Sequence, residues 1–380
     1  MNKIVIAPQG FKESLAGIKI ARAMEQGVRV VWPDAETVLA PVADGGDGTL
    51  QTLVDSSGGE VRTARAVDPL GREIDVEWGA LGDGKTAVIE MARSSGLALL
   101  NPRERDPLDS TTYGVGQVMK SALDAGFTRF IIGIGGSATN DGGAGMAQAL
   151  GARLFDENND DLPVGGAALA RLHRIDISGF DERLTAASIE VACDVNNPLC
   201  GPTGASVIFG PQKGASADGV ATLDAALNRF GEIAKRDLGS DVSDFPGAGA
   251  AGGLGAGLMA FANARLRPGA DIVLEAVGLD EKLEDADLVI VGEGQIDRSS
   301  VFNKSPVAVA QRARQRGIPV IGIAGSLGTG YHEVHELGID AVFSLVSGPM
   351  TLADAMADTV MLVASATEQA CRAMAAARRG

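Results

Sequence analysis

Cysteine and histidine are scarce in this chain, with three of each among 380 residues. Three cysteines are too few for a disulfide framework in a chain of this length, so we expect Cys193, Cys200 and Cys371 to be buried thiols. The spacing of Cys193 and Cys200 is not that of a zinc site, and no Ser-His-Asp or Cys-His pattern is evident. The sequence therefore argues against a disulfide-stabilised secreted domain, a zinc site and a histidine-activated nucleophile.

Positive charge is also in deficit, because 33 Lys and Arg face 49 Asp and Glu, giving a net charge of −16. Nucleic-acid binding needs a basic surface, so we expect no nucleic-acid partner. The first residues lack the apolar segment of a signal peptide, and the uncharged stretch 245–264 is mostly glycine and alanine, too weakly apolar to span a bilayer. We expect a cytoplasmic protein with no membrane partner.

Glycine is abundant, at 51 residues, while 45% of the chain is hydrophobic. That hydrophobic share argues for a folded chain with a large core rather than a disordered one. Many of the glycines stand where predicted strands end, which are the places where backbone can approach a bound anion closely.

Short β-branched runs alternate with helical patterns, which indicates an α/β fold with mostly parallel strands. Strands are expected at 3–7, 37–40, 130–133, 189–193, 288–291, 320–323 and 341–344, and helices at 16–28, 48–56, 142–150, 221–238, 306–315 and 352–378. Between residues 60 and 90 three strands follow one another without helices, which predicts an antiparallel insertion.

The last strands resemble the first two, so we expect a discontinuous Rossmann-like domain with a parallel sheet. It would comprise residues 1–62 and 280–380, with a second α/β domain inserted at 63–279.

One segment, Gly79-Ala-Leu-Gly-Asp-Gly-Lys-Thr86, matches the phosphate-binding P-loop pattern. A P-loop follows a strand and opens a helix, whereas residues 87–91 have the pattern of a strand. Since Asp-Gly between two strands is typical of a hairpin turn, we expect a hairpin here.

A second segment, Gly133-Ile-Gly-Gly-Ser-Ala138, matches a dinucleotide-binding pattern. The following residues delay the helix beyond its usual position, and the acidic residue about 20 positions on, Asp156, lies in a polar loop. We therefore favour an anion-binding loop, in which the amides of Gly135, Gly136 and Ser137 and the hydroxyls of Ser137 and Thr139 hold phosphate or carboxylate. The alternative is a tight strand-to-helix turn.

Similar polar loops follow other predicted strands, and they begin near Gln9, Asp44, Asp194 and Gly292. In open α/β sheets, ligands bind at the carboxyl ends of strands, where these loops would converge. They offer carboxylates suited to Mg²⁺ and amides and lysines suited to phosphate. This combination favours phosphoryl transfer.

Several longer motifs together resemble the bacterial glycerate kinase family over essentially the whole chain. They are Phe11-Lys-Glu-Ser-Leu15, Pro41-Val-Ala-Asp-Gly-Gly-Asp-Gly-Thr49, Ile89-Glu-Met-Ala92, Ile132-Gly-Ile-Gly-Gly-Ser-Ala-Thr-Asn-Asp-Gly-Gly143, Ala192-Cys-Asp-Val-Asn-Asn-Pro-Leu199, Phe209-Gly-Pro-Gln-Lys-Gly214, Gly247-Ala-Gly-Ala-Ala-Gly-Gly253 and Gly292-Glu-Gly-Gln-Ile-Asp297. The resemblance implies ATP- and Mg²⁺-dependent phosphorylation of D-glycerate, usually at the 2-hydroxyl. It also implies two α/β domains with the active site in the cleft between them.

The motifs supply the candidate site residues. Lys12, Asp194 and Asp297 are the catalytic candidates. Asp194 or Asp297 is the candidate base, and the other of these two or Asp44 is the candidate magnesium ligand, with Asp44 and Asp297 favoured for the metal. Lys12 and Lys304 are candidates for binding phosphate or the glycerate carboxylate. The remaining candidates for substrate or phosphate binding are Ser14, Asp44, Gly45, Gly46, Gly135, Gly136, Ser137, Thr139, Asn140, Asp141, Lys213 and Gly294.

Several of these residues have structural alternatives. Ser14 and Asp141 are also candidates for helix caps, Asp44, Asp194 and Asp297 for caps or Asx turns, and Lys213 for the end of a loop.

Two loops depart from the family pattern. Gln9 and Gly10 replace Asp and Ser, Gln295 replaces Arg, and Asn303 replaces the Gly before Lys304. If positions 9 and 295 form an ion pair in relatives, the two glutamines delete both charges and keep a hydrogen bond. The alternatives to a D-glycerate kinase are a kinase for a related hydroxy acid, a non-catalytic sugar-acid sensor and an NAD-dependent dehydrogenase. The oligomeric state is open between monomer and homodimer.

Overall fold

The computed structural model describes residues 1–11, 14–301 and 304–378. By contact density the chain separates into two compact units, each an α/β structure. Unit 1 comprises residues 1–44, 51–57 and 270–380, and unit 2 comprises residues 45–50 and 58–269. The domain boundaries expected at residues 62 and 280 stay predictions.

Unit 1 contains a parallel sheet built from both ends of the chain. The strand order is β13-β12-β11-β1-β2. Its elements are β1 (Lys3–Pro8), α1 (Gly17–Val31), β2 (Glu36–Leu39), most of α2 (Thr49–Ser57), most of α10 (Gly269–Ala276), α11 (Leu279–Lys282), β11 (Leu288–Ile296), α12 (Ser305–Arg314), β12 (Val320–Leu327), β13 (Ala341–Ser344), α13 (Leu352–Ala357) and α14 (Thr359–Ala377). The expected Rossmann-like sheet of N- and C-terminal strands is thus confirmed.

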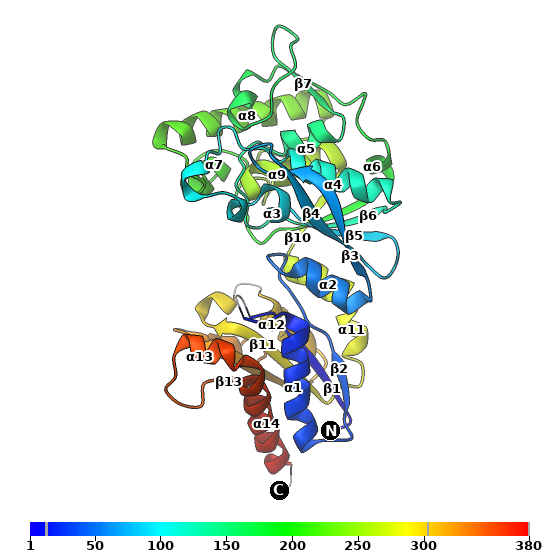
Figure 1. The fold of residues 1–380 in the computed structure, drawn as a ribbon, viewed down its shortest axis with the longest axis vertical. Helices are drawn as coiled ribbons and strands as arrows, with labels where there is room; N and C mark the ends of the chain where they lie inside the picture. The colour runs from blue at the N-terminus through cyan, green and yellow to red at the C-terminus, as the bar shows by residue number, and fades with distance from the viewer. Residues whose placement is uncertain (12–13, 302–303, 379–380) are drawn as a thin grey trace. The chain divides into compact units, whose positions relative to one another are not determined.

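Helices α1 and α14 lie side by side over the sheet of unit 1 (Figure 1). Ile4 and Ile6 of β1 pack with them in one apolar cluster, while Val5 between them is equally buried on the opposite face. Both faces of the sheet are therefore covered, as parallel sheets require. The two helices approach closely at Gly27, where a Cβ atom would lie 2.3 Å from the carbonyl oxygen of Ala364.

Unit 2 contains a six-stranded sheet in the order β10-β9-β6-β5-β4-β3. The first four strands run parallel, and β4 is antiparallel to both β5 and β3, which confirms the expected antiparallel insertion. The elements are β3 (Glu60–Val67), β4 (Glu73–Ala80), β5 (Thr86–Glu90), α3 (Ala92–Ser95), α4 (Tyr113–Asp124), β6 (Arg129–Gly133), α5 (Ala144–Ala149), β7 (Arg153–Phe155), β8 (Arg174–Asp176), α6 (Arg183–Ala186), β9 (Ser188–Ala192), α7 (Ala205–Phe209), α8 (Ala217–Leu238), α9 (Ala250–Ala262) and β10 (Arg265–Arg267).

The segment that matches the P-loop pattern is a hairpin, as expected. It joins β4 to β5, and Ala80 pairs with Ala87 in antiparallel register. The turn is fixed by Asp83, whose carboxylate accepts hydrogen bonds from the amides of Lys85 and Thr86. Gly84 adopts a φ of 66°, which glycine tolerates best. A phosphate-binding loop is therefore excluded at this position.

Two sequence expectations need correction. The helix expected at 352–378 is two helices, α13 and α14, which meet at Asp358, where the hydroxyl of Thr359 binds the carbonyl oxygens of Ala355 and Met356. Cys371 is buried as expected, but Cys193 and Cys200 are only partly buried because they lie in the loop after β9. Within residues 1–11, 14–301 and 304–378, no helix is long and apolar enough to cross a membrane.

Candidate active-site residues of the two units

The carboxyl ends of three parallel strands meet at one edge of the unit 2 sheet. Glu90 of β5 pairs with Gly133 of β6, which pairs with Ala192 of β9. Gly45 passes directly over this edge, because a Cβ atom on Gly133 would lie 2.5 Å from its carbonyl oxygen. A Cβ atom on Gly45, whose φ is 89°, would lie 2.5 Å from the Cβ of Ala192. Glycine at these positions therefore allows two backbone segments to converge where parallel sheets bind ligands.

The loop after β6 is exposed at its start and buried at its end. Gly135 and Gly136 are exposed, whereas Ser137 is 7% exposed and Thr139 and Asn140 are fully buried. The side chains expected to hold an anion thus point into unit 2, and the exposed part of the loop offers backbone only. The amide nitrogen of Asn140 donates to the hydroxyl of Ser206 over 2.9 Å.

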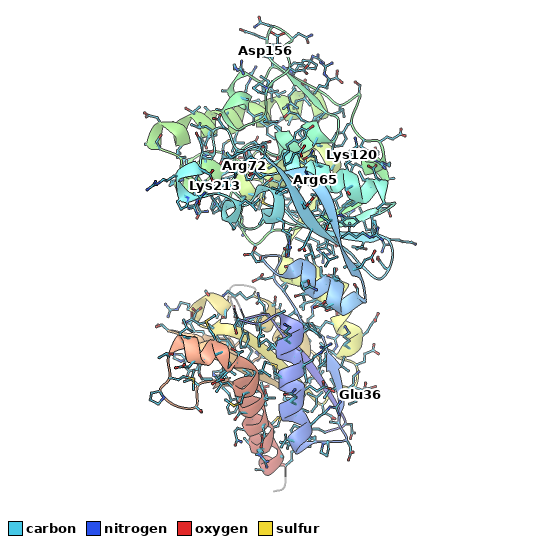
Figure 2. The ribbon with its side chains drawn as sticks, in the orientation of Figure 1. Glu36, Arg65, Arg72, Lys120, Asp156 and Lys213 are labelled. Carbon is cyan, nitrogen blue, oxygen red and sulfur yellow. The ribbon has the colours of Figure 1, made fainter. Side chains whose placement is uncertain are left out.

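Lys213 lies in the short helical turn that follows α7 (Figure 2). Its side chain is 1% exposed, and its Nζ donates to the hydroxyl of Ser137 and the carbonyl oxygen of Thr139, each over 2.7 Å. Burial lowers the pKa of Lys213 to about 7, although the nearby carboxylate of Asp141 opposes the shift. Lys213 therefore holds the loop after β6 from inside, and its phosphate-binding role stays a prediction.

Asp141 is fully buried and ties this loop to two helices. Its carboxylate accepts hydrogen bonds from the amide and hydroxyl of Thr112, before α4, and from the amides of Gly143 and Gly145 at the start of α5. Burial raises the pKa of Asp141, and these hydrogen bonds limit the rise. The carboxylate of Asp141 thus binds amides at the start of α5, although the N-cap residue of that helix is Gly143.

Asp194 is an exposed residue in the loop that follows β9. One carboxylate oxygen of Asp194 accepts a hydrogen bond from the amide of Gly269, the first residue of α10, over 2.9 Å. β9 lies between β10 and β6 in the sheet and runs parallel to both, so Asp194 follows the same carboxyl-end edge as Gly135. Its role as a base stays a prediction.

A charged cluster occupies the corresponding end of the unit 1 sheet. Glu293, near the end of β11, binds the Nζ of Lys304 and the hydroxyl of Ser300, each over 3.0 Å. Burial raises the pKa of Glu293, helped by Asp44 and opposed by Lys304 and Ser300. Gln9, after β1, donates its side-chain amide to Asp44 over 3.0 Å. Two carboxylates, one ammonium and one neutral amide are therefore gathered at this edge.

Glu293 was not among the residues expected from the sequence, although its motif was recognised. The sequence feature that could have identified Glu293 is its position between Gly292 and Gly294, directly after the apolar run 288–291. Gln295 is exposed on the same strand, and pairing of positions 9 and 295 in relatives stays a prediction. Lys12 and Asn303 lie outside the described residues.

Asp297, the other candidate of this motif, has a different environment from Glu293. One of its carboxylate oxygens accepts a hydrogen bond from the amide of Ser299 over 2.7 Å. Hydrogen bonds from Ser299 are the main reason that the pKa of Asp297 is lowered. Asp297 is therefore suited to stay ionised, whereas Glu293 is suited to accept a proton.

Whether the residues of unit 1 fit Mg²⁺ depends on the oxygen ligands that their side chains offer. Among the described residues no group of three or more acidic, histidine or cysteine side chains is placed to hold a metal. Enzymes that act on nucleotides bind Mg²⁺ through one or two carboxylates, with phosphates and waters completing the octahedron. Asp44 and Asp297 are both carboxylates of unit 1, and Asp297 is suited to stay ionised. These two residues satisfy that requirement, so unit 1 would fit the ion together with a bound nucleotide.

Comparison with known proteins gives one consistent result. The family model of the glycerate kinase family matches residues 4–375. A glycerate kinase of Halalkalibacterium halodurans is 52% identical over 99% of this chain and 98% of its own length. The glycerate 2-kinase of Escherichia coli is 52% identical over 93% of each chain. A crystal structure of a protein from Salmonella typhimurium LT2, described as glycerate kinase 2, superposes with a TM-score of 0.93 at 48% identity over 100% of both chains.

Proposed function

Because the chain belongs to the glycerate kinase family, whose members are phosphotransferases, we propose that it transfers a phosphoryl group from ATP to D-glycerate. The observation that carries this proposal is the agreement along the whole chain with relatives named glycerate kinase. The product we propose is 2-phosphoglycerate, because the relative from Escherichia coli is named glycerate 2-kinase.

Phosphoryl transfer requires positioning and charge neutralisation more than covalent chemistry. In unit 1 we assign Lys304 to the phosphate oxygens of the donor, with Glu293 as a positioning residue for its ammonium group, 3.0 Å away. Asp44 and Asp297 are the proposed carboxylates for Mg²⁺, which supplies charge neutralisation when bound. Lys12 is proposed for the same phosphate oxygens or for the glycerate carboxylate, and Ser14 for a polar contact to the nucleotide.

In unit 2 we assign the exposed amides of Gly135 and Gly136 to an anionic group. Lys213 would act indirectly, by holding Ser137 and Thr139 in place beneath those amides. Asp194, exposed at the same carboxyl-end edge of the sheet, is the proposed base for the acceptor hydroxyl. Gly45 and Gly46 are proposed as backbone contacts, and Gly294 as the equivalent in unit 1.

The test is ADP release from ATP and Mg²⁺ with D-glycerate, using L-glycerate and other small hydroxy acids as controls. Phosphorus NMR of the product distinguishes 2-phosphoglycerate from 3-phosphoglycerate. Turnover with D-glycerate supports the proposal. Binding of D-glycerate without turnover would indicate a sensor, preferred turnover of another acid would change the substrate, and binding of NADH without ATP would indicate a dehydrogenase.

A further inference from the structure

Unit 1 has a cavity of about 390 Å³ at the carboxyl ends of β11, β12 and β13. Its volume lies within the range of about 300–1,000 Å³ typical of small-molecule sites. Gly294 of β11 and Gly325 of β12 form part of its wall. A Cβ atom on Gly325 would lie 2.4 Å from the carbonyl oxygen of Gly294, so this stretch of the wall has to be bare backbone.

The lining of the cavity is apolar in one part and hydroxylic in another. Val346, Met350 and Leu352 supply large apolar side chains that are 39%, 39% and 77% exposed. Ser14 and Thr359, whose hydroxyls are 2.8 Å apart, also line it. A mainly apolar lining with a few placed hydroxyls is typical of small-molecule sites, and methionine adapts its shape to the ligand.

No described residue that lines the cavity is charged. Glycerate is a small anion, and binding it tightly requires compensating charge, so the cavity does not suit the acceptor. The charged cluster is nevertheless close along the chain, because Gly294 in the cavity wall directly follows Glu293, which binds Lys304. An uncharged ring would fit the cavity, and a negatively charged tail would fit the neighbouring Lys304. The two surfaces together therefore match a ligand that has both parts.

We propose that this cavity holds the adenosine portion of the nucleotide, with its phosphates directed toward Lys304. The inference rests on the proposed function, in which ATP is the donor. The base would lie against Met350 and Leu352, and the hydroxyls of Ser14 and Thr359 would bind polar atoms of the base or the ribose.

The first test fills the cavity. Ala355 lines it from α13, so Ala355→Trp should occupy the space of the base. Ala353→Trp is the matched control, because Ala353 is exposed on the same helix and does not line the cavity. Binding of ATP with Mg²⁺ is measured by calorimetry without glycerate, alongside binding of inorganic tripolyphosphate, and far-UV circular dichroism checks the fold.

We expect Ala355→Trp to weaken ATP binding at least about 10-fold, which corresponds to about 1.4 kcal/mol. Tripolyphosphate binding should be unchanged, and so should ATP binding by Ala353→Trp. A second pair of variants covers the case in which tryptophan disturbs the helix. Met350→Ala removes part of the wall and should also weaken ATP binding, whereas Met361→Ala, at a 60% exposed methionine outside the cavity, should not.

Unchanged ATP affinity in folded Ala355→Trp and Met350→Ala would overturn the cavity assignment and leave the proposed function standing. A changed oligomeric state with unchanged ATP affinity would also overturn the cavity assignment and leave the proposed function standing, because a second copy of the chain would then occupy the cavity. Equal loss of ATP and tripolyphosphate binding would also overturn it. If the wild-type chain binds no ATP, both this inference and the proposed donor fail.

Discussion

Replacing Lys213 by methionine should make the stability of unit 2 depend differently on pH. The ammonium of Lys213 is buried, and its pKa falls from an ordinary value of 10.5 to about 7. Between these two values the unfolded chain holds a proton that the folded chain has released. Raising the pH through this window therefore favours the folded wild-type chain, and the methionine variant lacks that gain.

The size of the effect follows from the shift. One proton difference is worth about 1.4 kcal/mol per pH unit, so the wild-type chain should gain about 3 kcal/mol relative to Lys213→Met between pH 7 and pH 9.5. Losing the hydrogen bonds to Ser137 and Thr139 costs the variant about 1–3 kcal/mol at each buried acceptor that is left unpaired. The same substitution removes the cost of burying an ammonium, so the two effects partly cancel near pH 7.

The assay is urea unfolding followed by tryptophan fluorescence. The chain has two tryptophans, and a Trp32→Phe background leaves Trp78, which is buried in the same unit as Lys213. The control is Lys120→Met, at an exposed lysine of α4 in that unit. The reasoning is refuted if the free energies of unfolding of wild type and Lys213→Met stay parallel from pH 7 to pH 9.5.

Three further changes have defined outcomes. Lys304→Met should raise the KM for ATP by about 10-fold or more, because a charge-assisted contact to phosphate is lost. The kinetic control is Lys19→Met, at an exposed lysine of unit 1. Equal KM values in the two variants would contradict the assignment of Lys304. Gly252→Ala should lower the free energy of unfolding by about 2 kcal/mol or more. Gly252 has a φ of 68°, and a Cβ atom added there would lie 2.0 Å from the carbonyl oxygen of Thr139. An unchanged urea midpoint would refute this prediction. Gln9→Asp puts a second carboxylate beside Asp44, where the amide now donates, and should lower the Mg²⁺ concentration needed for half-maximal rate; a higher requirement would speak against a metal at Asp44.

The strands were predictable because their signal is local. The runs at 288–291 and 320–323 are continuous and apolar, and both became buried central strands. Helix α9 had no such signal in the sequence, because it is rich in glycine. In the structure Ala251, Gly252 and Gly253, near its start, have positive φ. Its helical form depends on close packing against the loop after β6, a contact between segments more than 100 residues apart.

The site was predictable only at the level of motifs. The sequence placed polar loops at strand ends, and the structure has them there. It did not show that Thr139 and Asn140 point into the core, because a run of small polar residues has the same pattern whether it faces solvent or a buried lysine. Nor could the sequence show that the pKa of Glu293 is raised. That shift arises from burial, and the partners of Glu293, Lys304 and Ser300, lie seven or more residues away in the chain.

The topology of unit 1 has a consequence for the order in which the chain can fold during synthesis. Ile4 of β1 pairs with Leu288 of β11, so about 280 residues are synthesised between the two partners. At about 5–20 residues per second, β1 and β2 leave the ribosome roughly 15–60 s before β11, the strand that pairs with β1. Most of unit 2, residues 58–269, emerges in one piece during that interval. The first 44 residues therefore have an exposed strand edge for most of the synthesis, and this is the period in which we expect the nascent chain to need protection from aggregation.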